Sequence, residues 1–311
     1  MSIYPLKLEP VFKDYLWGDG LLKKLYNKKT PYEVTAESWE VSCHPNGMST
    51  VANGEYKGMA LADVVKQLDA DLLGRPLASF DKERFPLLVK FIDAYDRLSI
   101  QVHPKDDYAK VNENGELGKT EMWYIIDAKP DAKLVFGVKP GTKKEDFAKA
   151  LKAGAPEDLL NFVPVKKGDM FFVPAGLLHA IGAGILIAEI QQNSDTTYRV
   201  YDYNRRGADG KLRPLHIDKA LDVIDFDADS TVTEGDNITC KYFSTTKHTL
   251  DGKKDFDKGF TMVICTEGNG KIVYSDGELD FVAGDSMIVP AALGSFSIEG
   301  KANLLTTTIP E

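Results

Sequence analysis

The sequence has 311 residues, of which 43% are hydrophobic and 27% are charged, the proportions of a folded globular protein. Lys and Arg total 38 against 47 Asp and Glu, so the formal net charge is −9. This balance argues against a general nucleic-acid-binding protein, although it leaves room for a local basic pocket. No secretory pattern and no apolar stretch near the ~18 residues of a membrane span is present, so we expect a soluble cytoplasmic protein.

Short β-rich runs separated by Gly, Pro, Asn and Asp dominate the chain, and a few segments have helical patterns. The predicted helices are Leu61–Leu72, Asp106–Glu113, a helix beginning at Thr142, and Ile217–Ile224. Thr142 and Glu145 have the spacing of a capping box, which predicts the start of the third helix. Many strands with few helices favour a barrel or a sandwich over a wound parallel sheet.

Two segments of the chain repeat one pattern, in which a Gly-Asp turn, a four-residue apolar strand and Pro-Ala follow in order. They are 168–175 and 284–291, and the spacing from Gly to Pro is the same in both. Glycine at a turn and proline at a strand end have specific backbone meanings, so we interpret the repeat as two related barrels. The first copy leads to His179 and the second to Ser295, so only the first is equipped to hold a metal.

Polar residues that could bind a metal alternate with apolar residues in two predicted strands. In LSIQVH, Gln101 and His103 lie on the face opposite the apolar side chains, and in KTEMW the residues Lys119 and Glu121 share one face. The turn after Pro174 delivers His179 to the next strand. Gln101, His103, Glu121 and His179 therefore make a candidate metal site, for which zinc fits and iron and manganese remain open.

These segments resemble the cupin superfamily, whose second motif, G-x5-P-x-G-x2-H, is matched by Gly168, Pro174, Gly176 and His179. Ala183 stands where the motif closes with Asn, and Gln101 stands where the first motif has its first His. The strings LSIQVHPKDDYA, GKTEMWYI, NSDTTYR and WEVSCHPNG resemble the type I mannose-6-phosphate isomerases. The resemblance runs from about Tyr4 to Arg205 and is weaker beyond, and the length is that of the compact bacterial form.

The resemblance implies roles for particular residues of this chain. The family's zinc ligands fall on Gln101, His103, Glu121 and His179, and its active-site arginine falls on Arg199. Glu189 and Lys119 match a pocket glutamate and the Lys-x-Glu lysine, and either could be the base of an enediol mechanism. Arg199 could assist ring opening and stabilise the enediolate, or it could bind the phosphate together with Lys90 and Ser99. His44 and His216 are interpreted as structural or loop residues.

We therefore predict a mainly β fold of two cupin (jelly-roll) β-barrels with a few peripheral helices. Residues 1–229 would form the catalytic cupin domain with helical additions, and residues 230–311 a C-terminal cupin-like barrel without a metal site. The function predicted is that of an isomerase with one Zn²⁺ per chain, which interconverts mannose 6-phosphate and fructose 6-phosphate. The alternatives are an isomerase of another sugar and a non-catalytic sugar-phosphate sensor. The expected partner is a small sugar phosphate, with neither nucleic acid nor membrane.

Overall fold

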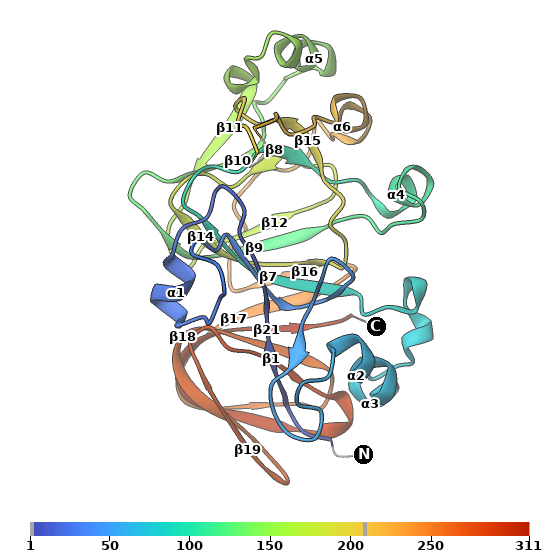
Figure 1. The fold of residues 1–311 in the computed structure, drawn as a ribbon, viewed down its shortest axis with the longest axis vertical. Helices are drawn as coiled ribbons and strands as arrows, with labels where there is room; N and C mark the ends of the chain where they lie inside the picture. Colours follow the sequence, from blue (N-terminus) through green and yellow to red (C-terminus); the bar gives the residue numbers. More distant parts are fainter. Residues whose placement is uncertain (1–2, 208–209, 311) are drawn as a thin grey trace.

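The computed structural model describes residues 3–207 and 210–310, and it confirms a mainly β fold. Three large sheets lie one above another along the long axis, and we call them upper, middle and lower as they appear in Figure 1. The upper sheet has the order β11 (Leu160–Pro164), β10 (Lys133–Val138), β13 (His179–Ala180), β8 (Ile100–Val102) and β15 (Tyr198–Tyr201). The middle sheet has the order β12 (Met170–Val173), β9 (Glu121–Ala128), β14 (Ile185–Gln192), β7 (Leu87–Ala94), β3 (Glu37–Val41) and β2 (Val11–Lys13).

The lower sheet combines strands from both ends of the chain. Its order is β16 (Asn237–Thr239), β17 (Ser244–Phe256), β21 (Phe296–Thr308), β18 (Thr261–Tyr274), β20 (Ser286–Val289), β1 (Leu6–Glu9) and β6 (Thr50–Val51), with β19 (Gly277–Val282) paired to β18. A small hairpin joins β4 (Cys43–His44) and β5 (Gly47–Met48). Within the described ranges, the pairings leave each of the three large sheets open.

The middle sheet is buried on both faces. The alternation of side chains along its strands decides on which face each polar residue lies. On β14, Ala188 and Ile190 belong to a core cluster shared with the lower sheet. Ile187 packs in a second cluster on the opposite face, toward the upper sheet. Because side chains alternate along a strand, Glu189 lies on the same face as Ile187. The candidate site therefore lies between the upper and middle sheets.

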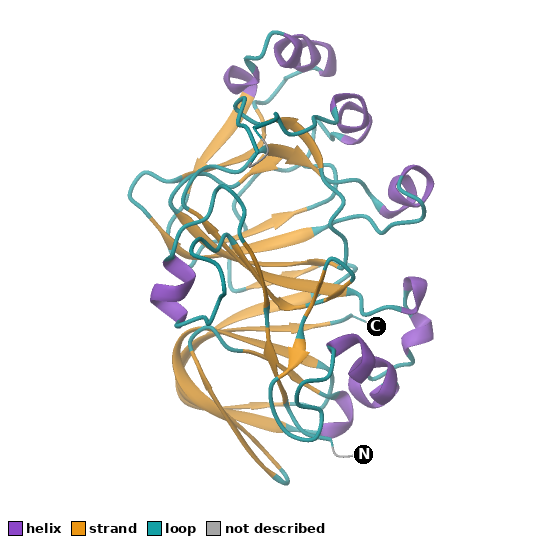
Figure 2. Ribbon diagram, in the orientation of Figure 1, coloured by secondary structure: helices purple, strands orange, loops and turns teal. Residues whose placement is uncertain are grey.

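The helices lie around the outside of the sheets, as Figure 2 shows. They are α1 (Leu21–Tyr26), α2 (Leu61–Leu68), α3 (Ala70–Leu73), α4 (Asp106–Asn112), α5 (Lys144–Lys152) and α6 (Ile217–Val223), with short 3₁₀ turns at Leu77–Ser79, Asp81–Glu83, Pro156–Leu159 and Ala291–Leu293. The helices predicted at 106–113 and 217–224 are confirmed to within one residue. The single helix predicted over Leu61–Leu72 is wrong in one respect, because Asp69 adopts a φ of 46° and divides it into α2 and α3.

The capping box predicted at Thr142 is also wrong. Lys143 is the residue that precedes α5, and no side chain caps this helix end. The Thr142 hydroxyl instead donates a hydrogen bond of 2.7 Å to the carbonyl of Lys139 in the preceding turn. Phe147 of α5 is fully buried and joins the helix to the core beneath it.

The repeated Gly-Asp turns have the same structure in both halves of the chain. Gly168 and Gly284 have a φ of 91° each, a conformation that favours glycine. Each glycine N–H donates a 2.8 Å hydrogen bond to a carbonyl of the neighbouring strand. The carboxylates of Asp169 and Asp285 each accept the backbone N–H three residues earlier, at 2.9 and 2.8 Å. The two halves thus share a local structure as well as a sequence pattern.

Helix α1, which the sequence patterns did not predict, begins at a buried carboxylate of the middle sheet. Asp93 in β7 accepts a 2.9 Å hydrogen bond from the backbone N–H of Leu21, the first residue of α1. Burial raises the pKa of Asp93 to about 6. The folded state therefore favours the protonated form, and this contribution to stability is complete below the unfolded pKa of about 4 and is lost as the pH rises to about 6.

We expect Asp93→Asn to stabilise the protein at pH 7.5 by about 1 to 2 kcal/mol, because the amide keeps an acceptor oxygen without a buried charge. The difference from the parent protein should disappear near pH 4. Urea denaturation at both pH values measures it. A variant less stable than the parent at pH 7.5 would show that the ionised carboxylate is needed.

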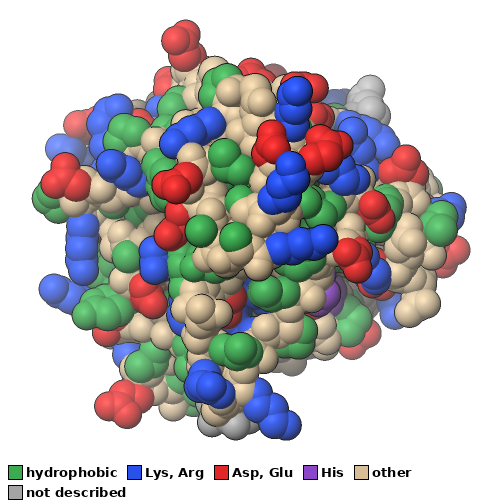
Figure 3. Space-filling view, turned by 90° about the horizontal axis from the view of Figure 1, so that it is seen from above, with side chains coloured by type: hydrophobic (Ala, Val, Ile, Leu, Met, Phe, Trp, Pro, Cys, Tyr) green, Lys and Arg blue, Asp and Glu red, His purple; other side chains and the backbone are tan. Residues whose placement is uncertain are grey.

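The upper end of the molecule shows mixed charges in Figure 3, with Lys and Arg side chains interspersed among Asp and Glu. A broad basic face is not visible from this side. In the part of the chain that the structure describes, no helix combines the length and apolar character needed to cross a bilayer.

Candidate active site

Three strands of the upper sheet carry one row of predicted site residues. His179 of β13 and Arg199 of β15 both lie opposite Gln101 of β8 in the strand pairing. Directly opposed side chains in antiparallel strands are ~5 Å apart at Cβ, so these three are neighbours. His103 lies two residues beyond Gln101 and emerges on the same face.

The middle sheet presents a second row toward the first. Glu189 lies opposite Trp123 on one side and Lys90 on the other, and Lys90 lies opposite Trp39. Glu121 is two residues before Trp123 and shares its face. Lys90, Glu121 and Glu189 are all buried, and buried charges require partners.

His103, Glu121 and His179 meet where the two rows converge. Their ligand-type atoms lie within 4.8 Å of one another, and no other such group of His, Cys, Asp and Glu occurs among the described residues. Glu121 Oε2 is 3.6 Å from His103 Nε2, and Glu121 Oε1 is 3.4 Å from His179 Nε2. Gln101 Nε2 is 3.4 Å from His179 Nε2, and rotation of the amide would present Gln101 Oε1 instead.

The donor atoms of this group suit a metal ion. Nδ1 of His103 donates to the Thr196 carbonyl and Nδ1 of His179 to the Leu177 carbonyl, both at 2.9 Å, which leaves each Nε2 without a proton and with a lone pair that can bind a metal. Burial lowers the pKa of His103 well below its ordinary value and that of His179 to about 4. Both rings are therefore neutral at pH 7, as metal ligands must be. Glu121 Oε1 is buried without a hydrogen-bond partner among the described residues.

Lys119 connects this group to the rest of the site. Its ammonium contacts the carboxylate of Glu121 and lies 3.2 Å from His103 Nε2 and 3.8 Å from Glu189 Oε1. Burial, with repulsion from Glu189, raises the pKa of Glu121 to about 7, and Lys119 opposes this change. The side-chain nitrogen of Lys119 therefore lies between the carboxyl groups of Glu121 and Glu189.

Glu189 is surrounded by donors. Trp123 Nε1 donates to Glu189 Oε2 at 3.0 Å, and Lys90 Nζ lies 3.2 Å from Oε1. Burial raises the pKa of Glu189, but Lys119 and Lys90 outweigh this and lower it to about 2. Lys90 is also 3.9 Å from Glu37 Oε2. Burial lowers the pKa of Lys90, but Glu189 and Glu37 outweigh burial and raise it, so both members of this pair are charged.

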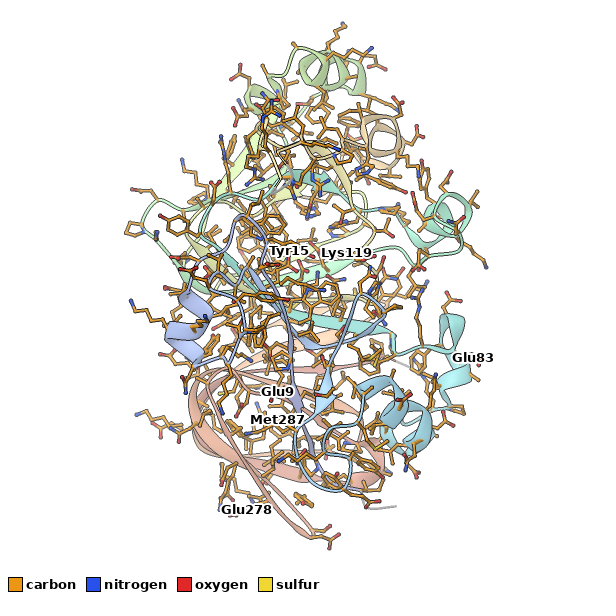
Figure 4. The ribbon with its side chains drawn as sticks, viewed as in Figure 1. Glu9, Tyr15, Glu83, Lys119, Glu278 and Met287 are labelled. Carbon is orange, nitrogen blue, oxygen red and sulfur yellow. The ribbon has the colours of Figure 1, made fainter. Side chains whose placement is uncertain are left out.

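A cavity of about 550 Å³ opens beside these groups. This volume falls in the range of ~300 to 1,000 Å³ that is typical of small-molecule sites. The predicted site residues that line it are Lys90, Ser99, Gln101, Lys119, Glu189 and Arg199. Tyr15 and Lys119, which both line the cavity, lie close together between the upper and middle sheets in Figure 4. The remaining predicted residues, His103, Glu121 and His179, are fully buried behind this lining.

Arg199 and Ser99 form a direct contact in the cavity wall. Arg199 Nε donates a 3.2 Å hydrogen bond to Ser99 Oγ, and Nη1 donates to the Pro214 carbonyl at 3.1 Å. His216, which was interpreted as a structural or loop residue, also lines the cavity, and its Nδ1 accepts the backbone N–H of Arg199 at 3.2 Å. His44 is buried, and its Nδ1 accepts a backbone N–H at 3.1 Å.

Sequence reasoning missed several residues of the cavity wall, namely Tyr15, Trp17, Glu37, Trp39, Asp195 and Arg213. Trp17 and Arg213 come from loops, where no alternation marks the side of a residue. Glu37 and Trp39 belong to β3, which is buried throughout. The aromatic residues of DYLWG and of the early WEV segment were the only features of the sequence that could have pointed to this wall of the cavity.

The mainly β sheets, the repeated turn and a buried His–Glu–His group define a protein of the cupin class. Residues 233–309 match the family described as the mannose-6-phosphate isomerase cupin domain. Residues 5–134 match the catalytic domain of type I phosphomannose isomerase.

The full-length comparisons identify the family. The chain is 41% identical to mannose-6-phosphate isomerase ManA of Bacillus subtilis, over 99% of both chains. It is 43% identical to the probable mannose-6-phosphate isomerase GmuF of the same organism, over 97% of this chain and 98% of the relative. A crystal structure of mannose 6-phosphate isomerase from B. subtilis superposes with a TM-score of 0.90 at 37% identity, over 98% of this chain and 99% of that one. The chain belongs to the type I mannose-6-phosphate isomerase family of enzymes.

Proposed function

We propose that this protein is a zinc-dependent isomerase that interconverts mannose 6-phosphate and fructose 6-phosphate through an enediol. The observation that carries the proposal is a buried His–Glu–His group beside a cavity lined by Lys119, Glu189 and Arg199. Family membership supports the substrate, and the cavity volume is adequate for a sugar phosphate.

Gln101, His103, Glu121 and His179 would hold the metal. With one carboxylate among the ligands, a zinc site would keep a net charge of about +1 and would act as a Lewis acid toward the sugar oxygens. The unprotonated Nε2 atoms of His103 and His179 and the unpartnered Oε1 of Glu121 support this ligand set.

Isomerisation removes a proton from C2 of the open-chain aldose and delivers one to C1, while a proton is lost from O2 and gained at O1. We propose Lys119 as the acid–base group, because it lies in the cavity wall against Glu121 and His103. Both oxygens of Glu189 face cations or donors, and this weakens it as a base. Glu189 would instead orient the amine of Lys119.

Arg199 would assist ring opening and stabilise negative charge on the enediolate oxygens, since a guanidinium is always charged. Ser99 would orient Arg199 through their hydrogen bond. Lys90 would contribute to substrate binding from the middle sheet.

We also propose that the open sheets form two cupin barrels. Residues 1–229 would form the catalytic domain, with the upper and middle sheets as the two walls of its barrel. Residues 230–311 would form the second barrel, which lacks a metal site. The enzyme would act in the cytoplasm, where its sugar-phosphate substrate is found.

Purified protein should form fructose 6-phosphate from mannose 6-phosphate, and treatment with a chelator should remove both the metal and the turnover. Adding Zn²⁺ back should restore activity, with metal content measured by elemental analysis. Full activity after the metal has been shown to be absent would contradict the mechanism. Tight binding of the sugar phosphate without turnover would indicate a sensor instead.

A further inference from the structure

A second arginine, which sequence reasoning did not identify, lines the cavity with Arg199. Arg213 is fixed along one edge, where Nε and Nη2 donate to Asp202 at 2.7 and 2.5 Å. Its guanidinium carbon lies 5.2 Å from the ring centroid of Trp17. Nη1 has no hydrogen-bond partner among the described residues, so a held guanidinium keeps free donors beside the cavity.

Positive charge is in excess at this part of the cavity wall. Arg199 makes its side-chain hydrogen bonds to neutral oxygens, those of Ser99 and Pro214. Asp202 is shared by Arg213 and Arg205, and Arg205 has a further ion pair with an exposed aspartate. The guanidinium groups of Arg199 and Arg213, which both line the cavity, therefore lack a carboxylate of their own to neutralise them.

Lys90, the other cation suggested as a phosphate ligand, has its charge already balanced by carboxylates. Lys90 lies 3.2 Å from Glu189 and 3.9 Å from Glu37, so two carboxylates already balance its charge. A phosphate placed against Lys90 would meet both of these anions. Excess positive charge and free guanidinium donors favour the wall formed by Arg199 and Arg213.

We propose that Arg213 is the principal ligand of the substrate's phosphate group, assisted by Arg199, and this rests on the proposed function. The phosphate carries about −1.5 to −2 charges and matches the planar fork of a guanidinium. Asp202 and Trp17 hold Arg213 in place before the substrate arrives, which reduces the entropy lost on binding. Trp17 also lines the cavity.

The test compares Arg213→Met with Arg205→Met in the metal-loaded enzyme. Arg205 binds the same Asp202 but is not part of the cavity wall, so it controls for the loop's structure. We expect Arg213→Met to raise the KM for mannose 6-phosphate by about 10- to 100-fold and to change kcat by less than about threefold. The inhibition constant of inorganic phosphate should rise in parallel. Arg205→Met should change both constants by less than about twofold, and Arg213→Lys should recover part of the loss.

Equal effects of the two variants would overturn the proposal and assign Arg213 a structural role. Unchanged inhibition by inorganic phosphate in Arg213→Met would also overturn it, and a larger loss in Lys90→Met would place the phosphate at Lys90. Calorimetric titration of the parent protein and Arg213→Met with inorganic phosphate separates this inference from the proposed function. Weaker phosphate binding by the variant would support the subsite even if the parent protein did not turn over mannose 6-phosphate.

Discussion

Glu121→Gln is expected to remove the bound metal and to lower turnover of mannose 6-phosphate by about 10³-fold or more. Glu121 is the only anion in the proposed ligand set, and its carboxylate lies between His103 and His179. Glutamine has nearly the same shape but carries no charge, so the site would lose its charge complementarity to a divalent cation. A loss of several kcal/mol of transition-state stabilisation corresponds to the expected fall in rate. Elemental analysis and a coupled assay for fructose 6-phosphate measure the two effects.

The matched control is Glu40→Gln. Glu40 is also a fully buried glutamate paired with a lysine, since Lys28 Nζ lies 2.7 Å away, but Glu40 points toward the lower sheet, where Ser286 donates to it at 3.0 Å. Its replacement should lower the free energy of unfolding and leave the metal content unchanged. If Glu121→Gln kept a full equivalent of metal, the ligand set proposed here would be wrong.

The pattern of polar and apolar residues in the sequence predicted those parts of the site whose residues lie on a single strand. Alternation placed Gln101 with His103 and Lys119 with Glu121, because side chains on a strand repeat every two residues whatever the strand pairs with. The repeated Gly-Asp turn was equally visible, because a glycine with positive φ leaves a signal at one position. The type of fold followed from the same local patterns.

The remaining features depend on contacts between distant segments. The register that sets His179 and Arg199 opposite Gln101 is a property of three strands together. Arg213 reaches the cavity through a loop held by Asp202, and no periodicity marks such a loop. Helix α1 begins at the carboxylate of Asp93, which lies far away in the sequence. The break at Asp69 likewise accompanies a hydrogen bond from the backbone N–H of Leu77 to its carboxylate, outside the helix.

Replacing Lys119 is expected to separate the two candidates for the base. Lys119→Met should lower kcat by about 10²- to 10⁴-fold, the usual contribution of a positioned acid–base group, and leave the metal in place. Glu189→Gln should lower kcat by only about 10-fold, because the amide oxygen can still accept a hydrogen bond from Trp123, while the charge that holds the amines of Lys119 and Lys90 is lost. Both are measured at saturating mannose 6-phosphate, with metal content checked for each variant.

Lys119→Arg decides whether Lys119 acts through its proton or only through its charge. A guanidinium keeps the positive charge beside Glu121 and Glu189 but does not give up a proton near neutral pH. If Lys119 is the base, Lys119→Arg should be nearly as inactive as Lys119→Met, and neither should exchange the C2 hydrogen of the substrate with solvent. Recovery of turnover in Lys119→Arg would reduce Lys119 to an electrostatic role. Loss of C2 exchange in Glu189→Gln alone would transfer the role of base to Glu189, because that carboxylate would then be the group that takes the proton.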